Sequence, residues 1–123
     1  MEVTFSYIED QEMVLVKTKG IADAQSSSQM SKSISQFMRK QRARRCLIDH
    51  TEIEMIEGKT LEIYQRPNEI IKLGIPFNIR IAAVILPMHA EHFQFLETVS
   101  LNRGIGYQVF FDRDKAEKWL KEI

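Results

Sequence analysis

The sequence predicts an α/β domain in which a largely parallel sheet is packed with helices. Apolar residues switch repeatedly between the spacing of a strand and that of a helix, and an almost unbroken apolar run occupies residues 79–86. The 123 residues are enough for one core, and no Pro- or Gly-rich linker or internal repeat marks a boundary. We therefore expect a single domain over residues 1–123.

The chain is expected to begin with an antiparallel hairpin. Val3, Phe5 and Tyr7 alternate with polar residues, which is the pattern of a half-buried strand. A short polar break at residues 9–12 precedes a second strand, which is predicted to end at Gly20. A loop this short favours antiparallel pairing of the two strands.

A helix and a short buried strand are predicted next. Between residues 22 and 42 the apolar residues follow helical spacing; they are Met30, Ile34, Phe37 and Met38. The serines of this segment are interpreted as its solvated face; they are Ser26, Ser27, Ser28, Ser31, Ser33 and Ser35. Residues 46–49 are then read as a short buried strand.

The middle of the chain is expected to hold a second helix and the central strand. Thr60 caps a helix that Pro67 kinks and Gly74 ends. Residues 79–86 do not alternate, and their apolar character is typical of a strand covered on both faces. Pro87 closes this strand.

Two more helices and one strand complete the predicted order. A helical stripe follows Pro87; it comprises Met88, His92, Phe95, Leu96 and Val99. Residues 107–111 form the last strand, and Asp112 caps a final helix that docks through its apolar residues, which are Ala116, Trp119, Leu120 and Ile123. The result is a mixed sheet of about five strands packed with about four helices, on one face or on both.

Charge and cysteine content exclude several classes of protein. Lysine and arginine number 17, as do aspartate and glutamate, so the chain has no net charge and no generic nucleic-acid or anionic-membrane binding is expected. The single cysteine, Cys46, cannot form an intrachain disulfide. There is no signal-peptide pattern, and the longest apolar run is too short to span a membrane, so a cytoplasmic location is expected.

One charged run stands out against this balance. Residues 39–45 hold five cations, and residues 52–57 hold acidic residues. The basic run is interpreted as solvated charge that complements the end of a helix. The alternatives are a patch for an acidic protein partner and a homodimer that pairs the two charged segments.

Several motifs resemble those of a known family. The carrying residues are the apolar run at 79–84, the segment Val109-Phe110-Phe111-Asp112, and Ala116 followed by Trp119-Leu120. Together with the order of elements, they resemble the SpoIIAA-like branch of the STAS domains, the anti-sigma-factor antagonist architecture. The resemblance implies a regulatory protein that acts through protein contacts. It also implies phosphorylation at the start of the helix after the third strand, where Thr51 is the available hydroxyl.

Candidate site residues cluster after two strands that are expected to be parallel. Asp49 and His50 are predicted to end the third strand, and His89 and His92 follow the fourth. Because the carboxyl ends of parallel strands meet at one edge, these residues are expected to lie together as a partner or ligand contact.

The same residue types allow two further uses of this cluster. A metal site could recruit Glu52 or Glu54, and Asp49 with a histidine could act in acid–base catalysis. However, His-x-x-His is common by chance, and the chain has no nucleophile elbow or phosphate loop.

The sequence therefore predicts a non-enzymatic regulatory or binding domain without metal or cofactor, acting through a protein partner. The alternative is a binder of a small apolar or lipid-like ligand in the crevice at the strand ends, since methionines and the aromatic side chains of Phe93 and Phe95 are suited to lining a pocket. A metal-dependent enzyme is the third hypothesis.

Overall fold

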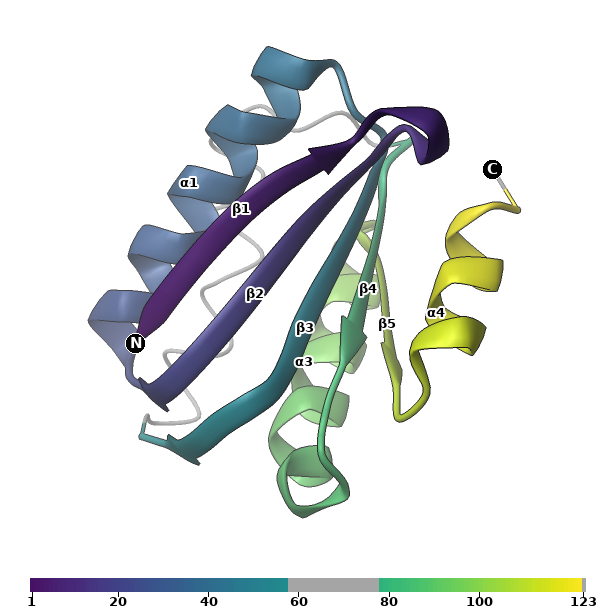
Figure 1. The fold of residues 1–123 in the computed structure, drawn as a ribbon. Coiled ribbons are helices and arrows are strands. Elements are labelled where there is room, and N and C mark those ends of the chain that lie inside the picture. The colour runs from purple at the N-terminus through teal and green to yellow at the C-terminus, as the bar shows by residue number, and fades with distance from the viewer. Residues whose placement is uncertain (58–77, 123) are drawn as a thin grey trace.

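The computed structural model describes residues 1–57 and 78–122 and shows helices on both faces of a sheet (Figure 1). The strands are β1 (Glu2–Ile8), β2 (Met13–Ala22), β3 (Arg45–Ile56), β4 (Arg80–Val84) and β5 (Gly106–Phe110). The helices are α1 (Ala24–Gln41), α3 (Ala90–Asn102) and α4 (Arg113–Leu120), with two 3-10 turns, η1 (Glu9–Gln11) and η2 (Pro87–His89).

The sheet has the mixed topology that the sequence predicts. Its five strands lie in the order β1-β2-β3-β4-β5, with β1 and β2 antiparallel and the remaining neighbours parallel. The turn η1 closes the hairpin at the predicted polar break. Helices α1 and α3 lie on one face of the sheet and α4 on the other (Figure 1).

The run at residues 79–86 is the buried strand β4 with its flanks. It lies between β3 and β5, and its residues from Ile81 to Ile85 are at most 4% exposed. Ile81 and Ala83 join the core under α1 and α3, whereas Ala82 and Val84 join the core under α4. The absence of alternation in this run thus has the expected cause, because both faces of the strand are covered.

Helix α1 forms where the sequence predicts it, but three of its serines do not lie on a solvated face. Asp23 caps the helix by accepting a hydrogen bond from the Ser26 backbone N–H at 2.8 Å, and this bond lowers the pKa of Asp23. Ser27, Ser31 and Ser35 are buried rather than solvated. Ser31 Oγ and Ser35 Oγ each donate to the carbonyl one turn earlier, at 3.1 and 2.9 Å. Their polarity is satisfied within the helix, so they can face the core.

The described residues contain three α-helices, where the sequence predicts four. The helix predicted from Thr60 to Gly74, with its kink at Pro67, lies outside the described residues. None of the helices within residues 1–57 and 78–122 is long and apolar enough to cross a membrane.

The face that α3 buries agrees only in part with the predicted stripe, of which Val99 is buried and Leu96 packs against the core. Met88 is 74% exposed and Phe95 is 38% exposed, whereas Phe93, Val99 and Ser100 are buried. Pro87 starts η2, and the α-helix begins only at Ala90. Met88 therefore lies outside the helical repeat, and the buried face is rotated to include Phe93 and Ser100 beside Val99.

Helix α4 is capped by Asp112 as predicted, since the side chain of Asp112 accepts a hydrogen bond from the Asp114 N–H at 2.8 Å. Ala116 and Leu120 are fully buried, while Trp119 is only half-buried against Phe110.

At the carboxyl end of α4, Arg45 Nε donates to the Leu120 carbonyl at 3.0 Å and Arg80 Nη1 donates to the Trp119 carbonyl at 2.7 Å. Two guanidinium groups from the sheet thus hold the carboxyl end of the helix.

Candidate functional site

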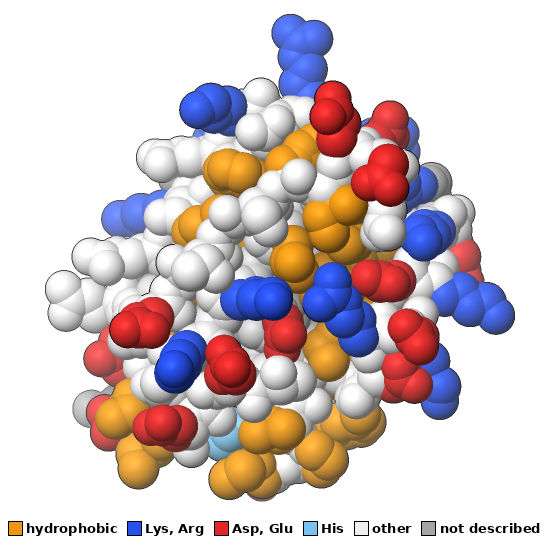
Figure 2. Space-filling view, in the orientation of Figure 1, with side chains coloured by type: hydrophobic (Ala, Val, Ile, Leu, Met, Phe, Trp, Pro, Cys, Tyr) orange, Lys and Arg blue, Asp and Glu red, His pale blue; other side chains and the backbone are white. Residues whose placement is uncertain are grey.

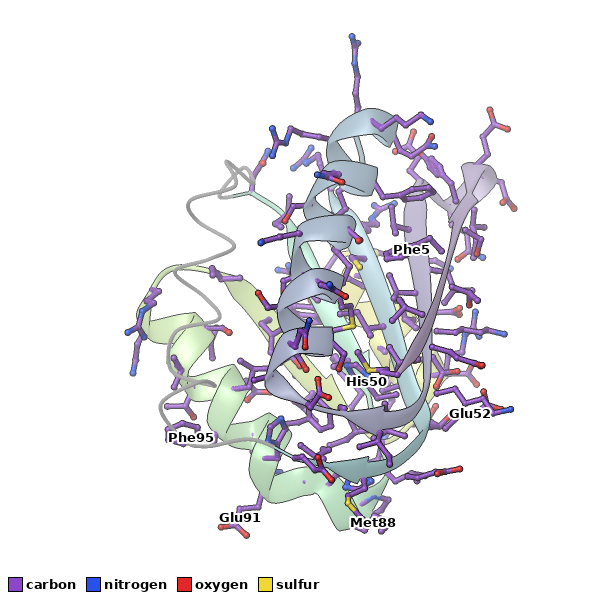
Figure 3. All side chains as sticks on the ribbon, turned by 90° about the vertical axis from the view of Figure 1, so that its left-hand side faces the viewer. Phe5, His50, Glu52, Met88, Glu91 and Phe95 are labelled. Carbon is purple, nitrogen blue, oxygen red and sulfur yellow. The ribbon has the colours of Figure 1, made fainter. Side chains whose placement is uncertain are left out.

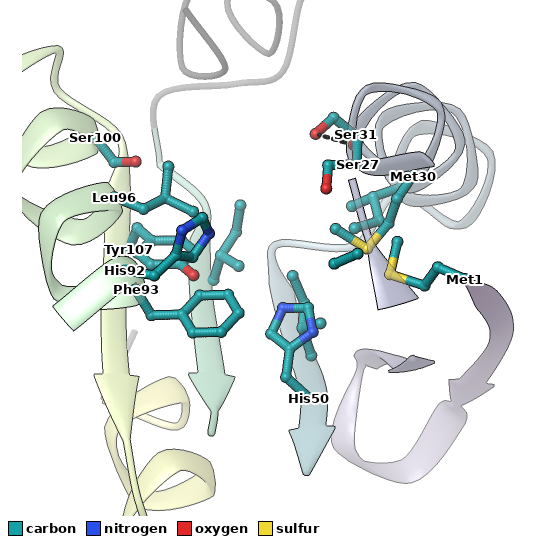
Figure 4. Close-up of a pocket in the computed structure, with 14 residues that line it drawn as sticks. Met1, Ser27, Met30, Ser31, His50, His92, Phe93, Leu96, Ser100 and Tyr107 are labelled. Atoms are coloured by element: carbon teal, nitrogen blue, oxygen red, sulfur yellow. Dashed lines mark hydrogen bonds between the residues drawn. The ribbon is translucent and has the colours of Figure 1, made fainter. Parts of the chain in front are cut away.

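A small cavity lies between α1 and α3, over the sheet (Figure 4). Its volume is about 50 Å³, and most of its lining is apolar. The residues labelled around it in Figure 4 are Met1, Ser27, Met30, Ser31, His50, His92, Phe93, Leu96, Ser100 and Tyr107. Two of the histidines singled out by the sequence, His50 and His92, therefore line the same cavity.

His50 enters the cavity from β3 and is held on two sides. Its ring is 4% exposed, and its Nδ1 lies 2.7 Å from Thr18 Oγ1 on the neighbouring strand β2. The ring stacks on Phe93 of α3, with centroids 4.7 Å apart and an interplanar angle of 23°. These contacts give the buried imidazole both a polar and an apolar partner, which is what a core histidine requires.

His92 reaches the same phenyl ring from the helix. Its centroid lies 4.9 Å from that of Phe93, and the rings are nearly perpendicular at 87°. Phe93 thus lies between two imidazoles, one stacked and one at its edge. The sequence singled out both histidines but not Thr18, which the parallel pairing of β2 and β3 brings beside His50.

Asp49 does not join this cluster. Successive side chains of a strand point to opposite faces, so Asp49 lies on the face of Leu47 and α4, while His50 lies on the face of Ile48 and α1. Asp49 Oδ1 accepts hydrogen bonds from the Thr51 N–H at 2.9 Å and from the Thr51 hydroxyl at 2.6 Å. The two residues form a local pair on the opposite side of the sheet from the cavity.

The predicted end of the third strand is wrong, and this changes the position of its residues. β3 continues past Asp49 and His50 to Ile56, and β2 continues past Gly20 to Ala22. Gly20 adopts a φ of +97° at an irregularity in the β2–β3 pairing, which lets both strands run on. The alternation of Glu52, Ile53, Glu54 and Met55 in the sequence was the signal for this extension.

His89 occupies a third place, at the carboxyl edge of the sheet. It lies in η2, directly after β4, and its Nε2 is 3.2 Å from the carbonyl oxygen of Ile53 in β3. This contact ties η2 to the extended end of β3. The three histidines therefore come from a strand, a 3-10 turn and a helix, and only two of them share a cavity.

The described residues offer little for metal or nucleophilic chemistry. Within residues 1–57 and 78–122, no group of three or more His, Cys, Asp or Glu side chains could hold a metal ion. Burial raises the pKa of the Cys46 thiol to about 12, so the thiolate that nucleophilic attack needs is not formed near neutral pH.

Comparison with known proteins supports the fold at low sequence identity. No family model matches the chain, and no curated protein does. An uncharacterised protein of the DUF3478 family from Shewanella loihica, described as having a SpoIIAA-like fold, superposes with a TM-score of 0.60 at 15% identity, covering 96% of this chain and 93% of that one. The chain has a SpoIIAA-like fold.

A second solved structure has the same architecture. The anti-sigma factor antagonist SpoIIAA, in its unphosphorylated form, superposes on 99% of this chain and 100% of its own, with a TM-score of 0.57 and 12% identity. The resemblance implied a phosphorylated hydroxyl at the start of the helix after the third strand. Thr51 does not occupy that position, because it lies within β3. The next hydroxyl, Thr60, is outside the described residues.

Proposed function

We propose that this chain is a non-enzymatic regulatory domain that binds a protein partner at the carboxyl edge of its sheet. The observation that carries the proposal is a group of exposed apolar side chains at that edge. Ile21, Met55, Met88 and Phe111 are 44%, 51%, 74% and 55% exposed. Exposed apolar side chains gathered in this way are typical of interaction surfaces.

Pairing contacts bring these four side chains to one end of the molecule, where Phe111 directly follows Phe110, the partner of Val84 at the end of β4. Ile21 and Met55 are direct partners in the β2–β3 register. The contact of His89 with the Ile53 carbonyl places η2, which carries Met88, beside the end of β3. Figure 2 shows hydrophobic side chains along the lower margin, where Figure 1 places these strand ends.

Acidic residues surround this apolar surface. Glu54 precedes Met55 in β3, Glu57 directly follows the end of that strand, Glu91 follows η2, and all three are exposed. Figure 3 places Met88 and Glu91 at the same end of the molecule. A partner with apolar anchors and a basic rim would match this edge, because opposite charges speed the encounter and favour the correct orientation.

The site residues predicted from the sequence divide between two roles in this proposal. His89 lies within the edge, while Asp49 and Thr51 lie on the adjoining face of β3, where they would form the margin of a partner contact. The likeness to the anti-sigma factor antagonist SpoIIAA supports a regulatory role. His50 and His92 belong to the cavity instead.

The test replaces two edge side chains and one control side chain. We expect Met55→Ser with Met88→Ser to weaken binding of a partner isolated from the native host at least about tenfold, because central apolar anchors dominate such interfaces. Leu101→Ser is the matched control, since Leu101 is 55% exposed at the end of α3, away from η2. Titration with the purified partner measures the dissociation constants of the unmodified chain, the double variant and the control. Equal affinities would contradict the proposed edge.

A second function is favoured by the cavity between α1 and α3. Its apolar lining suits a small apolar ligand, as the sequence suggested. A cavity of about 50 Å³ is well below the roughly 150 Å³ of an engineered cavity that binds benzene, so a larger ligand would need α1 and α3 to separate. Native mass spectrometry of protein from its own host tests this function, and a protein mass without any retained compound would count against it.

A further inference from the structure

The two outer strands of the sheet differ in how their edges are protected. β5 has five residues, and its Val109 N–H donates to the Glu97 carboxylate of α3 at 2.6 Å. β1 has seven residues, and within the described part of the chain its backbone hydrogen bonds go to β2 alone. Among the residues that the structure describes, the outward N–H and C=O groups of β1 therefore form an open edge on which another strand can pair.

The sequence of β1 lacks the features that usually prevent such pairing. Edge strands are commonly blocked by lysine, proline or a bulge. Residues 2–8 contain no lysine, arginine or proline, and their register with β2 is regular from Glu2 to Ile8. Glu2, at the first position, is the single charged residue of the strand.

We propose that β1 is a dimerisation edge, on which β1 of a second copy pairs antiparallel about a two-fold axis at Phe5. Such pairing would join the two sheets into one continuous sheet. It would also satisfy the outward backbone groups of both copies, since each strand would supply the donors and acceptors of the other.

The strand is self-complementary in this register. Val3 faces Tyr7 of the partner subunit, Thr4 faces Ser6 of the partner subunit, and Phe5 faces its own symmetry mate. Glu2 faces Ile8 of the partner subunit, so no like charges are opposed. Aromatic and β-branched pairs across neighbouring strands stabilise a sheet, which favours a second copy over an unrelated strand.

The core beneath β1 extends this complementarity. Phe5 is half-buried and packs on Phe37 of α1, with ring centroids 5.7 Å apart. Figure 3 shows Phe5 on the side of the sheet that α1 covers. Pairing at β1 would therefore place two Phe5–Phe37 pairs side by side. This surface is the edge of the sheet, whereas the proposed partner surface lies at the ends of its strands, so each proposal can fail without the other.

The test uses the two exposed side chains that face each other across the axis, at positions 4 and 6. Thr4→Lys with Ser6→Lys opposes lysines of the two copies, and we expect the dimer dissociation constant to rise about tenfold or more. Thr4→Lys with Ser6→Glu is the matched control, because it opposes a lysine to a glutamate and should retain the dimer. Sedimentation equilibrium measures both variants and the unmodified chain, and circular dichroism confirms their folding.

Each outcome decides the proposal. A dimer that the double lysine variant loses and the lysine–glutamate variant keeps supports it. A monomer at all concentrations up to the millimolar range overturns it and leaves the edge to a strand of another protein. A dimer that the double lysine variant keeps, or that both variants lose, overturns pairing in this register. Amide exchange of residues 2–8 gives an independent reading, because pairing should slow exchange as the protein concentration rises.

Discussion

The two faces of the sheet differ in what closes them. On one face, α1 and α3 cover a large core that includes buried polar side chains, among them Thr18, Ser35 and His50. On the other face, α4 is the one helix among the described residues that packs against β3, β4 and β5, and its buried cluster is much smaller. The face under α1 and α3, here called the deep face, can hold hydrogen-bonded polar groups and a cavity. The face under α4, here called the thin face, depends on a few apolar side chains and two arginines. Single substitutions on the thin face should therefore have the larger effects.

The largest effect is expected for Leu120→Ala. Leu120 is fully buried, and it anchors α4 to the small cluster. The substitution should lower the free energy of unfolding by about 2–5 kcal/mol, because it removes buried methyl groups and leaves a cavity. Urea denaturation measures the change. Lys118→Ala, on the exposed side of the same helix, serves as the control, and equal effects of the two substitutions would show that α4 is not anchored as described.

A smaller effect is expected on the deep face for Ser35→Leu. Ser35 is fully buried in α1, so a larger side chain must displace its neighbours. We expect a loss of about 1–3 kcal/mol in the free energy of unfolding. Gln36→Leu adds a side chain of the same size on the exposed side of the helix, and it should change stability by less than about 0.5 kcal/mol. Two similar values would argue that the serines face solvent after all.

Next in size is the coupling between Arg80 and Trp119. The guanidinium carbon of Arg80 lies 4.7 Å from the Trp119 ring centroid, and both side chains are partly exposed. In a double-mutant cycle, Arg80→Ala and Trp119→Ala should couple by about 0.5–1 kcal/mol. The cycle is measured by chemical denaturation. Strict additivity would mean that Arg80 holds the end of α4 through its hydrogen bond to the Trp119 carbonyl and its ion pair with Glu122, without a contribution from the Trp119 ring.

The smallest effect is expected when the native protein is treated with a thiol reagent, which would have to reach Cys46 on the deep face. Burial raises the pKa of its thiol from an ordinary value of 9.0 to about 12, so a thiol reagent at neutral pH should leave the native protein unlabelled. The unfolded thiol ionises first, and the stability that depends on this group is therefore lost as pH rises from about 9 to about 12. Mass spectrometry of the labelled protein gives the answer, and rapid labelling without denaturant would show that this face opens locally.

Local patterns determined much of the architecture. The unbroken apolar run of β4, the hairpin break before Met13 and the Asp112 cap were all visible in the sequence, because burial on both faces, tight turns and helix caps each impose their own residue types. The SpoIIAA-like fold followed from the order of these elements and from the motifs near the end of the chain.

Tertiary structure decided what the polar residues do. A serine reads as a solvated residue, yet Ser35 is buried because its hydroxyl bonds to the Ser31 carbonyl within the same helix. Asp49 and His50 are adjacent in sequence, but the continuation of β3 places them on opposite faces of the sheet. The sequence shows which side chains are polar, whereas their hydrogen-bond partners depend on which strands and helices become neighbours. For that reason the candidate site took its form only in the folded chain.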